Sequence, residues 1–438
     1  MTLRPALLAC AIALVSSSLG AAEQPKVEPP KYKSAQEIID AAPAEAWRTL
    51  DPANTLYMEL ETGRVIIELA PQFAPEHVAN IRTMAREHFW DGLSIYRSQD
   101  NFVVQFGDPN AGEAGAKSQG TAKAKLPAEF TRKAEGLKFS ALPDPDGWAP
   151  EVGFVDGFPA ARDPKTGEAW LTHCYGTLGA GRDTAPDSSN GSELYVVSGQ
   201  SPRQLDRNIT TVGRVVKGMD LLSVIPRGPE PMGFYDKSEL RTPIKAIKLA
   251  SDVPEAERTA LQLLRTGTPT FAAATEARRN RRDGWYVQPA GHIDVCNVPL
   301  PARTLEQAQA QEIRNLQNSH VAANVPTAND FDRFLTRDLL AYFRANGMPS
   351  VSDVEYKLLR NEPTQSGVAY PKYYAWVKAK SHDHSPVDGA VRVAAIDGKA
   401  FEVTSFISRS EIISDKDGIS SVFPALLVEQ VTALAESP

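Results

Sequence analysis

Cysteine, histidine and long apolar runs are all scarce in this 438-residue sequence, which contains only 3 cysteines and 7 histidines. No segment beyond the N-terminus reaches the run of about 18 apolar residues that a membrane-spanning helix needs. Positive charge is not in excess either, because 47 Lys and Arg face 54 Asp and Glu, giving a net charge of −7. The sequence therefore predicts no membrane span and gives no reason to expect nucleic acid as a partner.

The composition is that of an ordinary globular protein, with 42% hydrophobic and 23% charged residues. A chain of this length exceeds the size at which a single core usually keeps growing, so we expect two or more domains. No internal repeat is evident.

The N-terminus, "MTLRPALLACAIALVSSSLGAAEQP", carries one positive charge, an apolar run from Ala6 to Val15 and small residues before Glu23. This pattern predicts a signal peptide over residues 1–22, and hence an exported, periplasmic protein. A lipoprotein acceptor at Cys10 is disfavoured, because the apolar run continues past it. Cys174 and Cys296 would then remain, and their wide spacing leaves open whether they pair in an oxidising compartment or stay free.

The first part of the mature chain has alternating strand patterns. Residues 23–53 are expected to form a lead-in with a short helix within 34–50, started by a Ser34–Glu37 capping box. A hairpin turns at Thr62-Gly63, and helical spacing follows over residues 74–89. Residues 102–106 form a strand-like run, with Phe102, Val104 and Phe106 expected on one face. These patterns predict a mainly β first domain over residues 54–250, a closed antiparallel barrel with flanking helices.

Two segments break the strand pattern. Residues 131–170 are rich in Gly, Pro and Ala and are expected to be a long inserted loop. Residues 251–327 are expected to be a helical and irregular linker that includes a connecting helix. A second, α+β domain is expected over residues 328–438, with a helix over 330–347, three strands over 373–413 and a final helix over 423–436. Its helices should cover one face of an antiparallel sheet.

Four pieces of the first domain belong together: "APEHVANIRTMA", "IYRSQDNFVVQFGDP", "GTLGAGRDTAPDSSNGSELYVV" and "QLDRNITTVGRVVKGMD". In this order and at these spacings they resemble the cyclophilin family of peptidyl-prolyl isomerases. The second piece matches the family pattern F-H-R-x-x-x-x-F-x-x-Q-G-G-D without a gap. The residues in register are Arg97, Phe102, Gln105, Gly107 and Asp108.

The chemistry of proline isomerisation explains this residue set. Rotation about an X-Pro bond faces a barrier of ~18–20 kcal/mol, because the amide loses resonance when it twists. No bond is broken, so the reaction calls for no nucleophile, metal or cofactor. A pocket that grips the proline ring and a donor aimed at the amide nitrogen are what help, and a guanidinium is an always-charged donor.

The resemblance implies a role for each matched residue. Arg97 would donate to the prolyl nitrogen, Phe102 would contribute to catalysis and to the proline pocket, and Gln105 would order the arginine and the substrate backbone. Substrate binding would fall to eight further residues: Val103, Gly181, Arg182, Glu193, Tyr195, Gln204, Leu205 and Ile209. The inserted segment 131–170 should adjoin the rim of this pocket and reshape or cover it.

Several positions depart from the family pattern. Glu193 stands where the family has Gln, Leu194 and Tyr195 replace a Phe pair, Gln204 replaces an aromatic residue, Ile209 replaces His, and Phe106 replaces the first of two glycines. The central strand is thus kept while the rim is altered. Two readings follow: an isomerase with altered preference or turnover, or a cyclophilin-fold chaperone or peptide-binding module with little isomerase activity.

Other motifs favour structural interpretations. "SHDHS" (residues 381–385) lacks a third metal ligand nearby, and "RRNRR" (278–282) is better explained by an exposed helix face or by contact with acidic residues than by an anionic surface. "GTLGAG" is followed by no helix that would bind a nucleotide, and Ser192 has no pattern of a nucleophile.

The sequence thus favours an exported isomerase that acts on proline-containing unfolded or extended polypeptides and assists their folding. Its C-terminal domain would recruit substrates or mediate self-association. A further hypothesis makes that domain the functional part and the first domain a scaffold.

Overall fold

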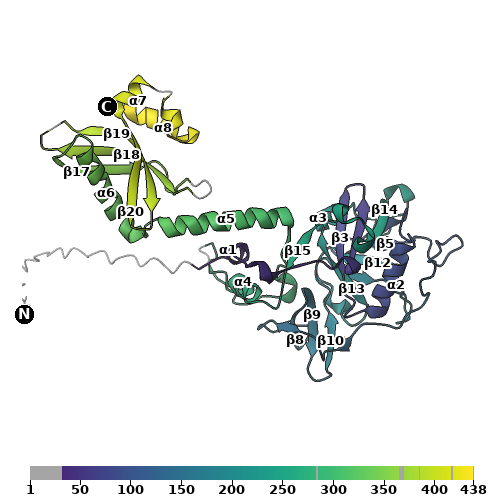
Figure 1. Ribbon diagram of the computed structural model, residues 1–438. Coiled ribbons are helices and arrows are strands. Elements are labelled where there is room, and N and C mark those ends of the chain that lie inside the picture. Colours follow the sequence, from purple (N-terminus) through teal and green to yellow (C-terminus); the bar gives the residue numbers. More distant parts are fainter. Residues whose placement is uncertain (1–31, 283–284, 365–368, 384, 416–417, 438) are drawn as a thin grey trace, which may run out of the picture.

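A computed structural model of the chain describes residues 32–437, apart from 283–284, 365–368, 384 and 416–417. The predicted signal peptide and His384 of the "SHDHS" motif lie outside these residues. Figure 1 shows two folded parts joined by one long helix, α5 (Leu305–Asn324), in which only Asn324 is buried. This matches the connecting helix that the sequence predicts. Within the described residues, no helix has the length and apolar character to cross a bilayer.

The first part contains a closed antiparallel barrel of eight strands in the order β11-β12-β5-β4-β14-β2-β3-β13. Closure leaves no free sheet edge. The predicted closed barrel is therefore confirmed. Its strands are β2 (Thr55–Leu60), β3 (Gly63–Leu69), β4 (Ser94–Ser98), β5 (Val103–Gly107), β11 (Thr177–Ala180), β12 (Leu194–Val197), β13 (Thr211–Lys217) and β14 (Thr242–Leu249).

Two helices flank the barrel, α2 (Pro75–Arg86) and the short α3 (Met219–Ser223). The predicted helical spacing is confirmed, since Val78, Ile81 and Met84 are fully buried in the same core as the inward-facing strand residues. Gly218 adopts a φ of +98° between β13 and α3, a backbone conformation that glycine reaches without strain.

Phe102 does not share a face with Val104 and Phe106, as the alternation predicted. Val104 and Phe106 point into the barrel core, whereas Phe102 packs with Val103 and Tyr195 on the outer side. The reason is local, because β5 begins only at Val103 and Phe102 still belongs to the preceding turn.

The inserted segment is folded, which corrects the expected long loop. It forms a five-stranded antiparallel sheet in the order β6-β10-β9-β8-β7. Its strands are β6 (Arg132–Lys133), β7 (Phe139–Ala141), β8 (Glu151–Val155), β9 (Phe158–Asp163) and β10 (Glu168–Leu171). Some of its buried side chains pack on Ala70 and Phe73 at the end of β3.

The lead-in and the expected linker pack together with this sheet. α1 (Ala35–Asp40) has the predicted capping box but ends at Asp40, and residues 47–49, expected to be helical, instead form a strand. That strand, β1 (Trp47–Thr49), pairs with β15 (Leu261–Leu264), which pairs with β16 (Ala302–Thr304). α4 (Pro269–Asn280) lies beside them.

Residues 35–50, 132–171 and 261–304 are called the flanking unit below. Their shared core contains Trp47, Phe154, Trp170 and Phe271, drawn from all three segments. Cys174 and Cys296 form a disulfide at this core, which settles the pairing that the sequence left open. Part of the expected linker is therefore a packed element of the first part of the molecule.

The second part is an α+β unit, as predicted, built on a four-stranded antiparallel meander β17-β18-β19-β20. Its strands are β17 (Val351–Leu358), which the sequence analysis missed, β18 (Lys372–Ser381), β19 (Val387–Ile396) and β20 (Ala400–Ser408). Its helices are α6 (Ala328–Ala345), α7 (Arg409–Ser414) and α8 (Ala425–Glu436).

Helices cover both faces of this sheet, not one as expected. α6 packs on the face that carries Tyr373 and Val377, whereas α7 and α8 pack on the face that carries Tyr374 and Ala390. Successive residues of β18 are buried on opposite sides, because neighbouring side chains of a strand point to opposite faces.

Candidate functional site

A groove of about 920 Å³ runs over the outer surface of the barrel. It is lined by residues of β4, β5 and β12, by the 3-10 turn Arg203–Leu205 and by the segment after α3. Ten of the eleven residues that the sequence analysis singled out line this groove: Arg97, Phe102, Val103, Gln105, Gly181, Arg182, Glu193, Tyr195, Leu205 and Ile209. Gln204 does not line it and is exposed on the neighbouring turn.

Arg97 is held by three acceptors. It lies opposite Gln105 across the β4–β5 pair, and its Nη1 donates to Gln105 Oε1 at 2.9 Å. Its Nε donates to the Met232 carbonyl at 2.7 Å and its Nη2 to Gln99 Oε1 at 2.5 Å. A guanidinium has five N–H groups. Counted over the described residues, two N–H groups of Arg97 therefore stay available to a ligand in the groove.

Two aromatic rings enclose the same guanidinium. The Arg97 Cζ atom lies 4.8 Å from the ring centre of Phe234 and 5.8 Å from that of Phe102. Arg97 is half-buried, and this burial lowers its pKa from the usual value without removing its charge. A charged donor in a partly dry site interacts more strongly with developing charge than one in water.

A chain of hydrogen bonds continues from Gln105 away from Arg97. Gln105 Nε2 donates to the Tyr96 hydroxyl at 2.7 Å, and that hydroxyl donates to Glu193 Oε2 at 2.6 Å. The Asp108 backbone N–H donates to Glu193 Oε1 at 2.9 Å. Gly107 makes room for the carboxylate, because a Cβ there would lie 2.2 Å from Glu193 Oε2.

Burial is the largest influence on the pKa values of Glu193 and Tyr96 in this hydrogen-bond chain. It raises the pKa of Glu193 to about 7, with the negative charge of Asp108 adding to the effect and the hydrogen bond from Tyr96 opposing it. Burial also raises the pKa of Tyr96, and the neighbouring Glu193 raises it further. The Tyr96 hydroxyl therefore keeps its proton, while Glu193 titrates near neutrality.

The apolar part of the groove is formed by Phe102, Val103, Tyr195 and Ile209, which pack together. Gly179 allows the Tyr195 ring to lie flat on β11, since a Cβ at this glycine would lie 2.2 Å from the ring. This cluster offers a concave apolar surface beside Arg97 of the kind that a proline ring fits.

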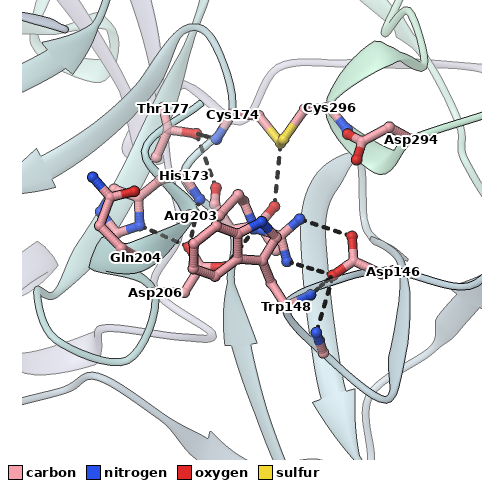
Figure 2. A network of polar contacts seen from close by, with 12 residues as sticks. Asp146, Trp148, His173, Cys174, Thr177, Arg203, Gln204, Asp206, Asp294 and Cys296 are labelled. Atoms are coloured by element: carbon pink, nitrogen blue, oxygen red, sulfur yellow. Dashed lines mark hydrogen bonds and ion pairs between the residues drawn. A yellow bond between two sulfur atoms is a disulfide. The ribbon is translucent and has the colours of Figure 1, made fainter. Parts of the chain in front are cut away.

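Behind this surface lies a buried polar network, shown in Figure 2. The Tyr195 hydroxyl lies 2.9 Å from His173 Nε2, and His173 Nδ1 lies 2.9 Å from Asp206 Oδ1. Because the carboxylate can only accept, Nδ1 carries the proton, and Nε2 of a neutral ring accepts from Tyr195. The His173 ring is fully buried, and burial raises the pKa of Tyr195, so this hydroxyl stays protonated.

Arg203 links that network to the inserted sheet. Its Nε donates to Asp206 at 2.6 Å, and its two Nη atoms donate to Asp146 at 3.0 and 3.1 Å. Asp146 belongs to the connection between β7 and β8. No residue of 131–170 lines the groove. The insertion therefore supports the pocket from behind and does not cover its rim, contrary to the expectation from sequence.

Five residues near the groove were missed by the sequence analysis. Tyr96, at the His position of the family pattern, was the one that could have been found from the motif. Met232 and Phe234 lie in a Gly- and Pro-rich segment with no recognisable pattern. His173 and Asp206 are 33 residues apart, and nothing local in the sequence joins them.

The other motifs are explained by structure. Arg279 of "RRNRR" pairs with Asp144 at 2.8 Å, which is the contact with an acidic residue that the sequence analysis favoured. Among the described residues there is no group of three or more His, Cys, Asp or Glu side chains arranged to hold a metal ion.

Comparisons with known proteins agree with this geometry. Residues 55–249 match the family model "Cyclophilin type peptidyl-prolyl cis-trans isomerase/CLD". A probable peptidyl-prolyl cis-trans isomerase of Brucella suis is 29% identical over 205 residues, which cover 45% of this chain and 82% of that protein. The human peptidyl-prolyl cis-trans isomerase-like 1 is 32% identical over 81 residues, which cover 18% of this chain and 46% of that protein.

A crystal structure of a cyclophilin from Hirschia baltica is also similar, with 25% identity and a TM-score of 0.47 over 63% of this chain and 98% of that one. The family match coincides with the limits of the closed barrel, from β2 to β14, and takes in the groove beside Arg97. Residues 55–249 of this chain therefore belong to the cyclophilin-type peptidyl-prolyl cis-trans isomerase family.

Proposed function

We propose that this chain accelerates rotation about X-Pro bonds in unfolded or extended exported polypeptides and so assists their folding. The observation that carries the proposal is the position of Arg97. It presents two available N–H groups beside the apolar surface of Phe102, Val103 and Tyr195.

The mechanism needs no covalent step. The proline ring binds against the apolar cluster, which fixes the ring while the rest of the peptide rotates. As the amide twists, its nitrogen becomes pyramidal and basic, and an N–H of Arg97 then donates to it. This contact forms only in the twisted state, so it lowers the barrier without stabilising the planar ground state. One pre-placed donor of this kind contributes about 3–4 kcal/mol.

Gln105 and Gln99 position the arginine in this scheme. Each accepts from one Nη atom of Arg97, and the Met232 carbonyl accepts from Nε, so the guanidinium plane is fixed before substrate arrives. A fixed donor loses little entropy when it binds its acceptor. The guanidinium is planar, so the three N–H groups that donate to Met232, Gln105 and Gln99 also fix the directions of the other two N–H groups.

The test is an isomerisation assay on an Ala-Pro peptide with wild-type protein, Arg97→Ala and Arg86→Ala. Arg86 is a matched control, because it is exposed and pairs with Asp252 away from the groove. We expect Arg97→Ala to lower kcat/KM by about a hundredfold to a thousandfold, and Arg86→Ala to leave it unchanged. A wild-type rate equal to the spontaneous rate would exclude an isomerase.

A binding module without turnover is the alternative, and one observation favours it. Ile209 lines the groove at the position where the family pattern has His, and Gln204 lies outside the groove at the position of an aromatic residue. Calorimetric titration with the same peptide separates the two functions. Binding with no acceleration of isomerisation would support the module.

Export is proposed from two features that agree. The N-terminal segment has the composition of a signal peptide, and the Cys174–Cys296 disulfide suits an oxidising compartment such as the periplasm. Expression with the native N-terminus in a Gram-negative host should place the protein in the periplasmic fraction, starting at Glu23. Recovery of the uncleaved chain from the cytoplasm would contradict this proposal.

A further inference from the structure

The hydrogen-bond chain that leads from Arg97 to Glu193 has only one consistent direction. Gln105 Oε1 accepts from Arg97, so the Gln105 amide nitrogen must face Tyr96 and donate to its hydroxyl oxygen. The single Tyr96 proton is then left for Glu193 Oε2. Each member fixes the orientation of the next, and the chain ends on a carboxylate.

We propose that Tyr96 and Glu193 are positioning residues for the isomerase reaction, and that catalysis requires Glu193 in its carboxylate form. The inference rests on the proposed function, because it concerns how Arg97 and Gln105 are held during that reaction. Neither side chain needs to touch the reacting amide. They act by keeping the Gln105 oxygen, and not its nitrogen, toward Arg97.

Protonation of Glu193 reverses the direction of the hydrogen bond between Tyr96 and Glu193. Oε1 is already occupied by the Asp108 N–H, so the added proton sits on Oε2 and points at the Tyr96 oxygen. Tyr96 then has no acceptor for its own proton unless the Gln105 amide turns over. A turned amide would set its nitrogen against Arg97 Nη1, two donors facing each other, and the arginine would lose a positioning contact.

The surroundings make this change available near neutral pH. Glu193 is only partly exposed, and its burial raises its pKa to about 7. The titratable and charged groups that line the groove with it are Tyr96 and Arg97 from β4, Asp108 after β5, and Arg182 and Asp183 after β11. Asp108 adds to the rise. Arg97 and Tyr96 do not titrate in the same range, since one stays charged and the other neutral.

The experiment measures kcat and KM between pH 5.5 and 8.5 by a protease-free assay on an uncharged Ala-Pro peptide. Four proteins are compared: wild type, Tyr96→Phe, Glu193→Gln and Arg97→Ala. In Glu193→Gln the single amide oxygen is needed by the Asp108 N–H, so its nitrogen faces Tyr96 and imitates the protonated carboxyl. Tyr96→Phe keeps the ring that stacks on Phe234.

We expect kcat of the wild type to fall as the pH drops through about 7, by between about twofold and tenfold, the effect of one lost hydrogen bond. Both variants should show that reduced kcat at every pH, with KM nearly unchanged. Wild-type kcat in Glu193→Gln or Tyr96→Phe, or a flat wild-type profile, would overturn the inference while leaving the isomerase intact. Wild type as inactive as Arg97→Ala would instead overturn the proposed function. The wild-type profile needs no variant, so a variant that fails to fold does not prevent the test.

Discussion

Removal of the Cys174–Cys296 disulfide should destabilise the first part of the molecule strongly. The bond closes a loop of 122 residues. In the chain-entropy model, freeing a loop of that length lowers the free energy of unfolding by about 5 kcal/mol at 25 °C. Natural domains have unfolding free energies of only about 5–15 kcal/mol. Removal of the disulfide would therefore abolish a large share of the free energy of unfolding.

The structure indicates which part of the molecule would lose stability when the disulfide is removed. Cys174 lies in the core of the flanking unit with Trp47 and Trp170 and follows His173 directly. The barrel is closed by its own strand pairing, and the groove is lined by no residue of the flanking unit. We therefore expect the double variant Cys174→Ser/Cys296→Ser to keep isomerase activity at temperatures at which it is folded.

Urea unfolding followed by tryptophan fluorescence and by far-UV circular dichroism measures the change. Oxidised wild type, reduced wild type and the double variant should be compared, because the reduced protein controls for the serine side chains. Separate transitions by the two probes would show that the molecule does not unfold in a single two-state step. If both reduced forms unfold within about 1 kcal/mol of the oxidised protein, the entropic reasoning is refuted for this loop.

Two further predictions concern buried groups in and behind the groove. Burial raises the pKa of Glu193 from 4.5 to about 7, so folding favours its protonated form, and the stability that this adds below pH 4.5 is lost as the pH rises through 7. The loss amounts to roughly 3 kcal/mol. Glu193→Gln should abolish this part of the pH dependence, which is measured by urea unfolding at pH 5 and pH 8. An unchanged pH dependence in the variant would contradict a raised pKa of Glu193. Tyr195→Phe should lower the free energy of unfolding by about 1–3 kcal/mol, because it leaves the buried His173 Nε2 without its donor. Its kcat/KM should stay near that of wild type because the ring remains, and a large fall in kcat/KM without loss of stability would show that the hydroxyl has a direct role.

The barrel was predictable because its signals are local. Alternating apolar residues mark β2 and β3, helical spacing marks α2, and the motif around Arg97 carries its own register. The alternation wrongly placed Phe102 on the same face as Val104 and Phe106, because β5 begins only at Val103 and Phe102 lies in the turn before it. Ten of the eleven proposed site residues share one groove because they were matched by position in those local motifs.

The flanking unit was not predictable in this way. Trp47 pairs with Leu264 across more than two hundred residues, and three-residue strands such as β1 and β16 leave too short a pattern to recognise. The His173–Asp206 contact is also invisible in sequence, because each residue is an ordinary polar residue in its own segment. Both faces of β18 are buried, and its mixed pattern of apolar residues conceals that a second pair of helices covers it.

The flanking unit also dictates an order of assembly. A chain that is synthesised from its N-terminus delivers β1 long before its partner β15, and Cys174 long before Cys296. β14 completes the barrel at Leu249, so the barrel can close first. Until residue 296 emerges, the Cys174 thiol is available to the wrong partner. The maturation of this protein is therefore expected to depend on a thiol oxidant that acts late, after most of the catalytic domain is already folded.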